Sequence, residues 1–122
     1  IDNFSLGGIV IGVDIETGRL KAPGFLKARY KRELTEHPLT GAVFEDFQVP
    51  YWKEVKETAI KAQKVFRELK TIGWDLAVSP RGPVVIEGNI EWGTTGIQAT
   101  NGGLLTPRNR SLFAQYGLTF HD

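Results

Sequence analysis

The stretch from residue 51 to 69 constrains the fold most, because its apolar side chains recur three and four residues apart. These side chains belong to Trp52, Val55, Ala59, Ala62, Phe66 and Leu69, and mostly lysines and glutamates occupy the positions between them. Pro50 suits the first turn of a helix, and Gly73 follows shortly after its end. The pattern therefore predicts an amphipathic helix at 51–69 that lies on one face of a sheet, with its apolar stripe in the core.

Two strand-like stretches follow, "TIGWDLAVS" and "PVVIEGN", and the residues between them are Pro80, Arg81 and Gly82. A three-residue hairpin loop commonly ends in the left-handed region, which glycine adopts without strain. Closing such a loop fixes the register of the two strands and sets Asp75 directly opposite Glu87. The sequence therefore predicts a hairpin with two carboxylates side by side.

The same register assigns further side chains to the carboxylate face. Asn89 lies two residues beyond Glu87 and points the same way, because strand side chains alternate between faces. Ala77 and Val85 are expected opposite each other further along that face. The face therefore combines three polar oxygen-bearing groups with an apolar section.

The remaining segments complete an α+β fold, with a mainly antiparallel sheet and the long helix on one face. Alternating apolar residues at 9–15 predict a strand, and "RLK" at 19–21 begins the returning strand of a hairpin. Residues 23–49 carry few clear signals. The tail is predicted to be a glycine-rich loop followed by a short helix near 107–116, with Thr106 as its N-cap and Gly117 as its stop.

Composition limits the class of protein. The chain has 122 residues, 41% of them hydrophobic and 24% charged, as expected for a globular domain. Its net charge of +1 provides no field that would attract nucleic acid or an anionic membrane. No apolar run approaches the roughly 18 residues that span a bilayer, and no signal peptide is visible. The absence of cysteine excludes disulfides and thiolate-bound zinc, and a cytoplasmic protein is expected.

The opposed carboxylates have two explanations. In the first they are hydrated surface groups that nearby lysines screen, which is common and contributes little energy. In the second, a cation lies between them and offsets their repulsion. Hard oxygen ligands without histidine or cysteine suit Mg²⁺, and His37 and His121 are not interpreted as ligands because they lie in a loop and at the chain end.

At this point the sequence resembles a known family. "GWDLAV" followed by "VVIEGNIEWG" is similar to the closing hairpin of ATP-grasp enzymes. With "IDNFSLGGIVIGVDIETGRL" and "HPLTG…VPYW" in the same order, the chain resembles sugar-transfer associated ATP-grasp proteins, relatives of the alpha-L-glutamate ligases. The likeness covers nearly the whole chain. It implies an ATP-dependent ligase that joins a carboxylate to an amine or similar nucleophile through an acyl-phosphate, with a link to polysaccharide or cell-envelope synthesis.

The resemblance also implies site residues. Asp75, Glu87 and Asn89 would hold one or two Mg²⁺ (or Mn²⁺) ions that bridge the phosphates of the cosubstrate ATP. "NFSLGG" is similar to a phosphate-contacting segment and would bring three further residues near the phosphates: Asn3, Gly7 and Gly8. Taken alone, the glycine pair is better explained by a bend before the strand that starts at residue 9. No side chain is assigned a catalytic role.

Parts of the family pattern have no match here: the upstream lysines and the glycine-rich loop that cover ATP are not found. The chain also contains no methionine. Residues 1–122 are therefore expected to form one domain, the C-terminal portion of a larger catalytic domain, that is inactive alone. A second copy of the chain could cover the open face. Trp92 and Gly93 are expected at the pocket rim, although Trp92 could serve packing alone. The alternative function is that of a small non-catalytic α+β binding or assembly domain.

Overall fold

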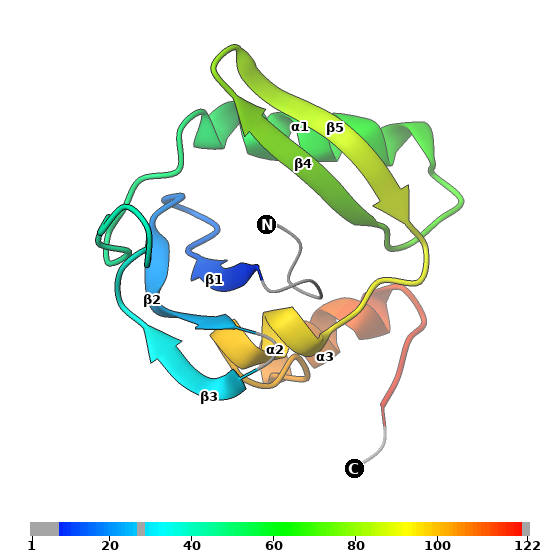
Figure 1. Ribbon diagram of the computed structural model, residues 1–122. Helices are drawn as coiled ribbons and strands as arrows, with labels where there is room; N and C mark the ends of the chain where they lie inside the picture. Colours follow the sequence, from blue (N-terminus) through cyan, green and yellow to red (C-terminus); the bar gives the residue numbers. More distant parts are fainter. Residues whose placement is uncertain (1–7, 27–28, 121–122) are drawn as a thin grey trace.

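The computed structural model describes residues 8–26 and 29–120. These residues form two antiparallel sheets and three helices, joined by loops (Figure 1). The first sheet has the strand order β1-β2-β3 and consists of β1 (Ile9–Val13), β2 (Leu20–Leu26) and β3 (Arg29–Leu34). The second sheet is a hairpin of β4 (Gly73–Ser79) and β5 (Gly82–Asn89). The helices are α1 (Trp52–Val65), α2 (Thr95–Asn101) and α3 (Pro107–Gln115). The α+β class with antiparallel pairing is as the sequence predicts.

The β1–β2 hairpin forms around a turn that Asp14 organises. The Asp14 carboxylate accepts hydrogen bonds from the backbone N–H groups of Glu16, at 2.9 Å, and Thr17, at 3.1 Å. These two bonds favour the ionised carboxylate and lower the pKa of Asp14. The turn ends at Gly18, whose φ of 75° lies in the left-handed region that glycine adopts without strain.

Two neighbouring aromatic side chains connect the first sheet, α1 and the second hairpin. The indole N–H of Trp52 donates to the carbonyl oxygen of Ile15 at 2.8 Å, and its ring packs directly on Gly18. The hydroxyl of Tyr51 donates to the carbonyl oxygen of Pro80 at 2.9 Å. The start of α1 is therefore fixed to both hairpin turns.

Helix α1 lies along one face of the β4–β5 hairpin and contacts both strands (Figure 1). The indole N–H of Trp74 donates to the side-chain oxygen of Gln63 at 3.1 Å, and the ring centroids of Phe66 and Trp74 are 6.0 Å apart. The helix ends at Val65, four residues before the predicted end. No α1 residue is buried and Phe66 is 45% exposed, so the prediction of a core stripe is wrong. A two-stranded sheet is too narrow to bury the apolar side of such a helix.

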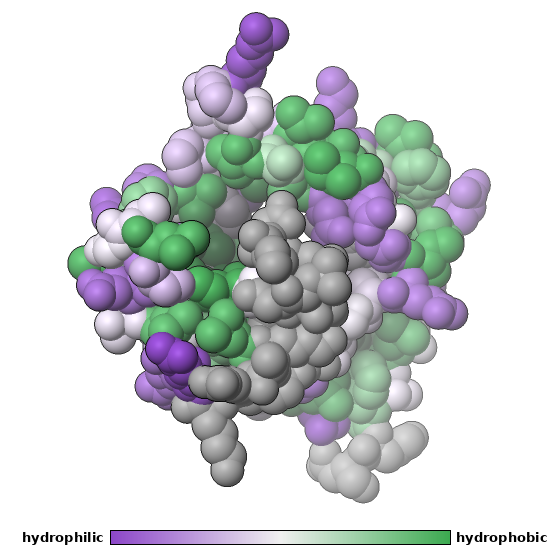
Figure 2. All heavy atoms as spheres, viewed as in Figure 1, coloured by the Kyte–Doolittle hydropathy of each residue, from purple (hydrophilic) through white to green (hydrophobic). Residues whose placement is uncertain are grey.

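The described part of the chain has little enclosed core. Its buried residues are Phe44, Gly8, Gly12, Gly18, Gly24 and Gly82. The chain exposes 9269 Å², whereas a compact monomer of this mass exposes roughly 6,600 Å². Figure 2 shows hydrophobic side chains gathered over the hairpin in the upper part of the visible face, with hydrophilic ones below them. Much apolar surface therefore remains open to solvent.

The C-terminal segment differs in part from the prediction. Residues 95–101 form α2, which packs against β1 and β2, where the sequence predicted only a glycine-rich loop. The predicted helix near 107–116 is confirmed as α3, and the Thr106 hydroxyl accepts from the backbone N–H of Asn109 at 3.2 Å as an N-cap does. Within the described residues, no helix has the length and apolar character needed to cross a bilayer.

The close packing of Trp52 on Gly18 gives a stability prediction. A β-carbon at Gly18 would lie 2.2 Å from Cγ of Trp52, whereas one at Gly41 would meet nothing within 4 Å, and both glycines have positive φ. Gly41→Ala should cost only the backbone strain, about 1–2 kcal/mol. Gly18→Ala should cost a further 1–3 kcal/mol or so, because Trp52 must move. Urea denaturation of both variants measures the difference, and equal losses would contradict the proposed anchoring.

Candidate metal centre

The β4–β5 hairpin brings two carboxylates into direct opposition. Gly73, Trp74 and Asp75 pair with Asn89, Gly88 and Glu87, in the register that the sequence predicts. The turn is tighter than predicted, because Ser79 already pairs with Gly82 and leaves a two-residue loop. The Ser79 hydroxyl stabilises this turn by donating to the Gly82 carbonyl oxygen at 2.7 Å and accepting from the backbone N–H of Arg81 at 3.1 Å.

A bulge at Ile86 compensates for the shorter loop. Leu76 pairs with Val85 and Asp75 pairs with Glu87, so Ile86 is the extra residue on β5. Between the bulge and the turn, the register is therefore one residue away from the prediction. Ala77 faces Val84, and the predicted pairing of Ala77 with Val85 is wrong. Beyond the bulge the two differences cancel, and the carboxylate pair forms as predicted.

The carboxylates lie on the hairpin face that points away from α1. Trp74 contacts α1 through Gln63 and Phe66, so its neighbour Asp75 points to the opposite face. Trp74 also covers Gly88, where an added β-carbon would lie 2.8 Å from the ring. One face of the hairpin is therefore held by packing, and the other carries the polar groups.

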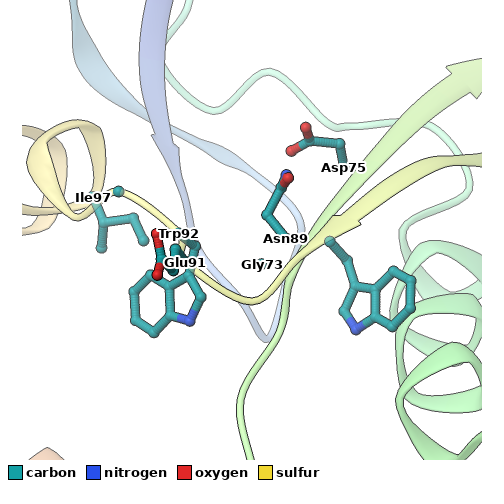
Figure 3. Close-up of a pocket in the computed structure, with 8 residues that line it drawn as sticks. Gly73, Asp75, Asn89, Glu91, Trp92 and Ile97 are labelled. Atoms are coloured by element: carbon teal, nitrogen blue, oxygen red, sulfur yellow. The ribbon is translucent and has the colours of Figure 1, made fainter. Parts of the chain in front are cut away.

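The three predicted ligands, Asp75, Glu87 and Asn89, share this outer face. The amide of Asn89 donates from Nδ2 to Oε1 of Glu87 at 3.1 Å, and the side chains of Asp75 and Asn89 point toward one another (Figure 3). The pKa of Asp75 is raised, first by partial desolvation and then by a hydrogen bond to Glu87 and the charge of Glu87. The Asp75 carboxyl therefore holds its proton more tightly than an isolated aspartate does.

A cavity of about 290 Å³ opens beside two of these three residues, and Glu87 does not line it. Asp75 and Asn89 line one part of it, and the lining also includes Gly73, Trp74, Glu91, Trp92, Gly93 and Ile97. Trp92 folds over the start of β4, since a β-carbon at Gly73 would lie 2.5 Å from Cβ of Trp92. Trp92 and Gly93 therefore lie in the pocket wall, where the sequence predicted them.

Glu91 is a pocket residue that the sequence reasoning did not assign. Its carboxylate would have been hard to place, because β5 ends at Asn89 and strand alternation gives no direction beyond that point. The signal that was present is position alone, two residues after Asn89 in the same motif.

The donor set fits a hard cation that has further ligands elsewhere. Two carboxylates and one amide oxygen match the preference of Mg²⁺ for oxygen, and Mg²⁺ is usually held by one or two carboxylates together with substrate phosphates. Within residues 8–26 and 29–120, no group of three or more His, Cys, Asp or Glu side chains could hold an ion. These side chains could therefore hold a cation only together with ligands from elsewhere.

The other residues considered in the sequence analysis either do not line the cavity or lie outside the described residues. Asn3 and Gly7 lie outside the described residues, and Gly8 is buried directly before β1 and does not line the cavity. His37 stabilises its own loop, because its Nδ1 accepts from the backbone N–H groups of Leu39 and Thr40. His121 lies outside the described residues.

Comparison with protein families gives the class of protein that this hairpin and its acid pair define. Residues 1–113 match the family described as sugar-transfer associated ATP-grasp. The match covers most of the chain, and the protein therefore belongs to the sugar-transfer associated ATP-grasp family. No curated protein and no solved structure matches the chain.

The raised pKa of Asp75 predicts how stability depends on pH. The folded state holds the Asp75 proton more tightly than the unfolded chain does. The resulting stabilisation is complete below the ordinary aspartate pKa, about 3.9, and is lost as the pH rises through the raised pKa. Asp75→Asn should remove this loss and make the metal-free protein more stable at neutral pH.

Thermal melts from acidic to neutral pH test this, and Asp14→Asn is the matched control because the pKa of Asp14 is lowered. Asp14→Asn should instead be less stable than wild type above the ordinary aspartate pKa, because it lacks the stabilisation that the lowered pKa of Asp14 provides there. A pH dependence that Asp75→Asn leaves unchanged would contradict the repulsion between Asp75 and Glu87.

Proposed function

We propose that this chain is the metal- and phosphate-binding portion of an ATP-dependent ligase that acts in the cytoplasm. In the proposed reaction, an oxygen of a small-molecule carboxylate attacks the γ-phosphorus of ATP and releases ADP, which gives an acyl-phosphate. An amine or similar nucleophile then attacks the acyl carbon, loses a proton and displaces inorganic phosphate. The products of each turn are the joined molecule, ADP and phosphate, and sugar-linked or cell-envelope molecules are the substrate class that the family suggests.

The observation that carries this proposal is the carboxylate pair with its neighbouring amide. Asp75, Glu87 and Asn89 share one hairpin face beside a cavity that can admit phosphates. A bound Mg²⁺ ion neutralises charge on the transferring phosphoryl group. The residues of this chain would orient that charge, and Trp92 would exclude water from one side of the cavity.

The open surface supports the proposal that further polypeptide completes the site. The chain exposes about 2,700 Å² more than a compact monomer of its mass. A standard interface buries about 800 Å² on each partner, so the excess is large enough for a substantial interdomain contact. We propose that the nucleotide-covering part of an ATP-grasp domain occupies this surface, with Asn3, Gly7 and Gly8 near the phosphates.

A second copy of the chain is the other occupant that the exposed surface allows. Sedimentation velocity over a wide range of concentrations distinguishes the two. A stable dimer would contradict the assignment of this surface to the nucleotide-covering part, whereas a monomer with apolar-dye binding supports it.

The metal site gives the most direct functional prediction. Saturating Mg²⁺ or Mn²⁺ should stabilise the domain by about 2.7 kcal/mol at a hundredfold excess over Kd, because only the folded state assembles the ligands. The titration must reach high metal concentration against a control of matched ionic strength, since the phosphates that normally share the ion are not provided. Glu87→Gln should abolish the stabilisation.

Glu91→Gln is the matched control, because Glu91 lines the same cavity and stands outside the proposed ligand set. This variant should keep the full metal effect, and metal-free Glu87→Gln should be at least as stable as wild type because one repelling charge is gone. An identical metal response in wild type and Glu87→Gln would show that the pair is ordinary surface charge.

A further inference from the structure

A second pocket, of about 340 Å³, shares Trp92 with the first and has a mainly apolar lining. Its lining includes five residues of the C-terminal segment: Leu104, Leu105, Phe113, Leu118 and Phe120. Phe113 and Phe120 meet edge to face with ring centroids 5.7 Å apart. An apolar cavity of about 150 Å³ can hold benzene, so this pocket has room for a ring-sized group.

Side chains form hydrogen bonds with the backbone polar groups around this pocket. The backbone N–H of Leu104 donates to Oε1 of Gln98 at 3.2 Å, and its carbonyl oxygen accepts from Nδ2 of Asn109 at 2.7 Å. The guanidinium of Arg110 donates to the carbonyl oxygens of Leu105 and Phe120, both at 3.2 Å. These four backbone groups are satisfied without a ligand, so the lining side chains present apolar surface.

Trp92 lines both pockets. Asp75 and Asn89 line the first pocket with it, and the apolar side chains line the second. Within the described part of the chain, the indole N–H makes only a long hydrogen bond, 3.4 Å to the Thr71 hydroxyl. A molecule with a carboxylate at one end and an apolar group at the other could therefore use both pockets around one side chain.

We propose that the apolar pocket next to Trp92 binds the hydrophobic group of the carboxylate substrate, and that this group is about the size of an aromatic ring or a short branched chain. This inference rests on the proposed ligase function, because it assigns the carboxylate end of the same molecule to the metal centre. Pockets of this kind, mainly apolar with a few polar groups that fix orientation, are typical of small-molecule sites.

The experiment follows the indole N–H signals of the tryptophans in ¹H–¹⁵N NMR spectra while 3-phenylpropionate is added to the full chain with Mg²⁺. The Trp92 signal should shift and saturate. The Trp52 signal should not move, because Trp52 lines neither pocket and its indole N–H donates a hydrogen bond to the carbonyl oxygen of Ile15. Leu105→Asn should weaken binding at least about fivefold, since it replaces apolar lining. Leu112→Asn is the matched control, because Leu112 is also an exposed leucine. It lies in α3 and lines neither pocket.

Two further arms separate this inference from the metal centre. Benzyl alcohol, which has the ring and no carboxylate, should shift Trp92 equally with and without Mg²⁺. Phenylpropionate should bind more tightly with Mg²⁺, and Glu87→Gln should remove only that gain. Absence of a saturable Trp92 shift with either ring probe would overturn the pocket assignment. Ring binding without a gain from Mg²⁺ would overturn its assignment to the carboxylate substrate, while the metal centre is judged by its own titration.

Discussion

The repulsion between Asp75 and Glu87 is the constraint on which the candidate site depends. The hairpin pairing sets these carboxylates opposite each other, and the pKa of Asp75 is raised as a result of desolvation and its neighbour. Like charges directly opposed on a sheet destabilise it. The hairpin tolerates the pair because its other face is held by Trp74, which packs on Gly88 and bonds to Gln63 of α1. Packing on one face thus compensates for a strained polar face that a cation would stabilise.

The sequence predicted the centre of this site because hairpin pairing is local. Strand alternation and a turn signal opposed Asp75 to Glu87 and aligned Asn89, but this pairing is correct because two local deviations cancel. The predicted loop length was wrong by one residue, and the bulge at Ile86 restored the register. Neither feature is encoded in a period-two pattern, since Ser79 closes the tighter turn through its own hydrogen bonds. Pairings near the turn were therefore mispredicted while the acid pair was correct.

Features that depend on contacts distant in the sequence were predicted less well. The periodicity of residues 51–69 identified a helix, but it could not show that only a two-stranded sheet lies beneath it, and the apolar stripe stays partly exposed. Helix α2 lies in a stretch rich in Thr and Gly, which form helices weakly. It packs against β1 and β2, and these contacts cannot be read from the sequence alone. Glu91 and the apolar pocket likewise depend on how Trp92 folds back on Gly73.

The central claim is that a divalent cation binds between Asp75, Glu87 and Asn89, and the most direct measurement is the position of bound Mn²⁺. Substoichiometric Mn²⁺ broadens NMR signals of nearby nuclei, so its effect on the backbone amides locates the ion. If the ion binds there, the amides of residues 73–75 and 87–89 broaden selectively, and the Gly41 loop is unaffected. Broadening centred on another acidic segment, such as Glu45 and Asp46, or spread evenly over the surface, would contradict it.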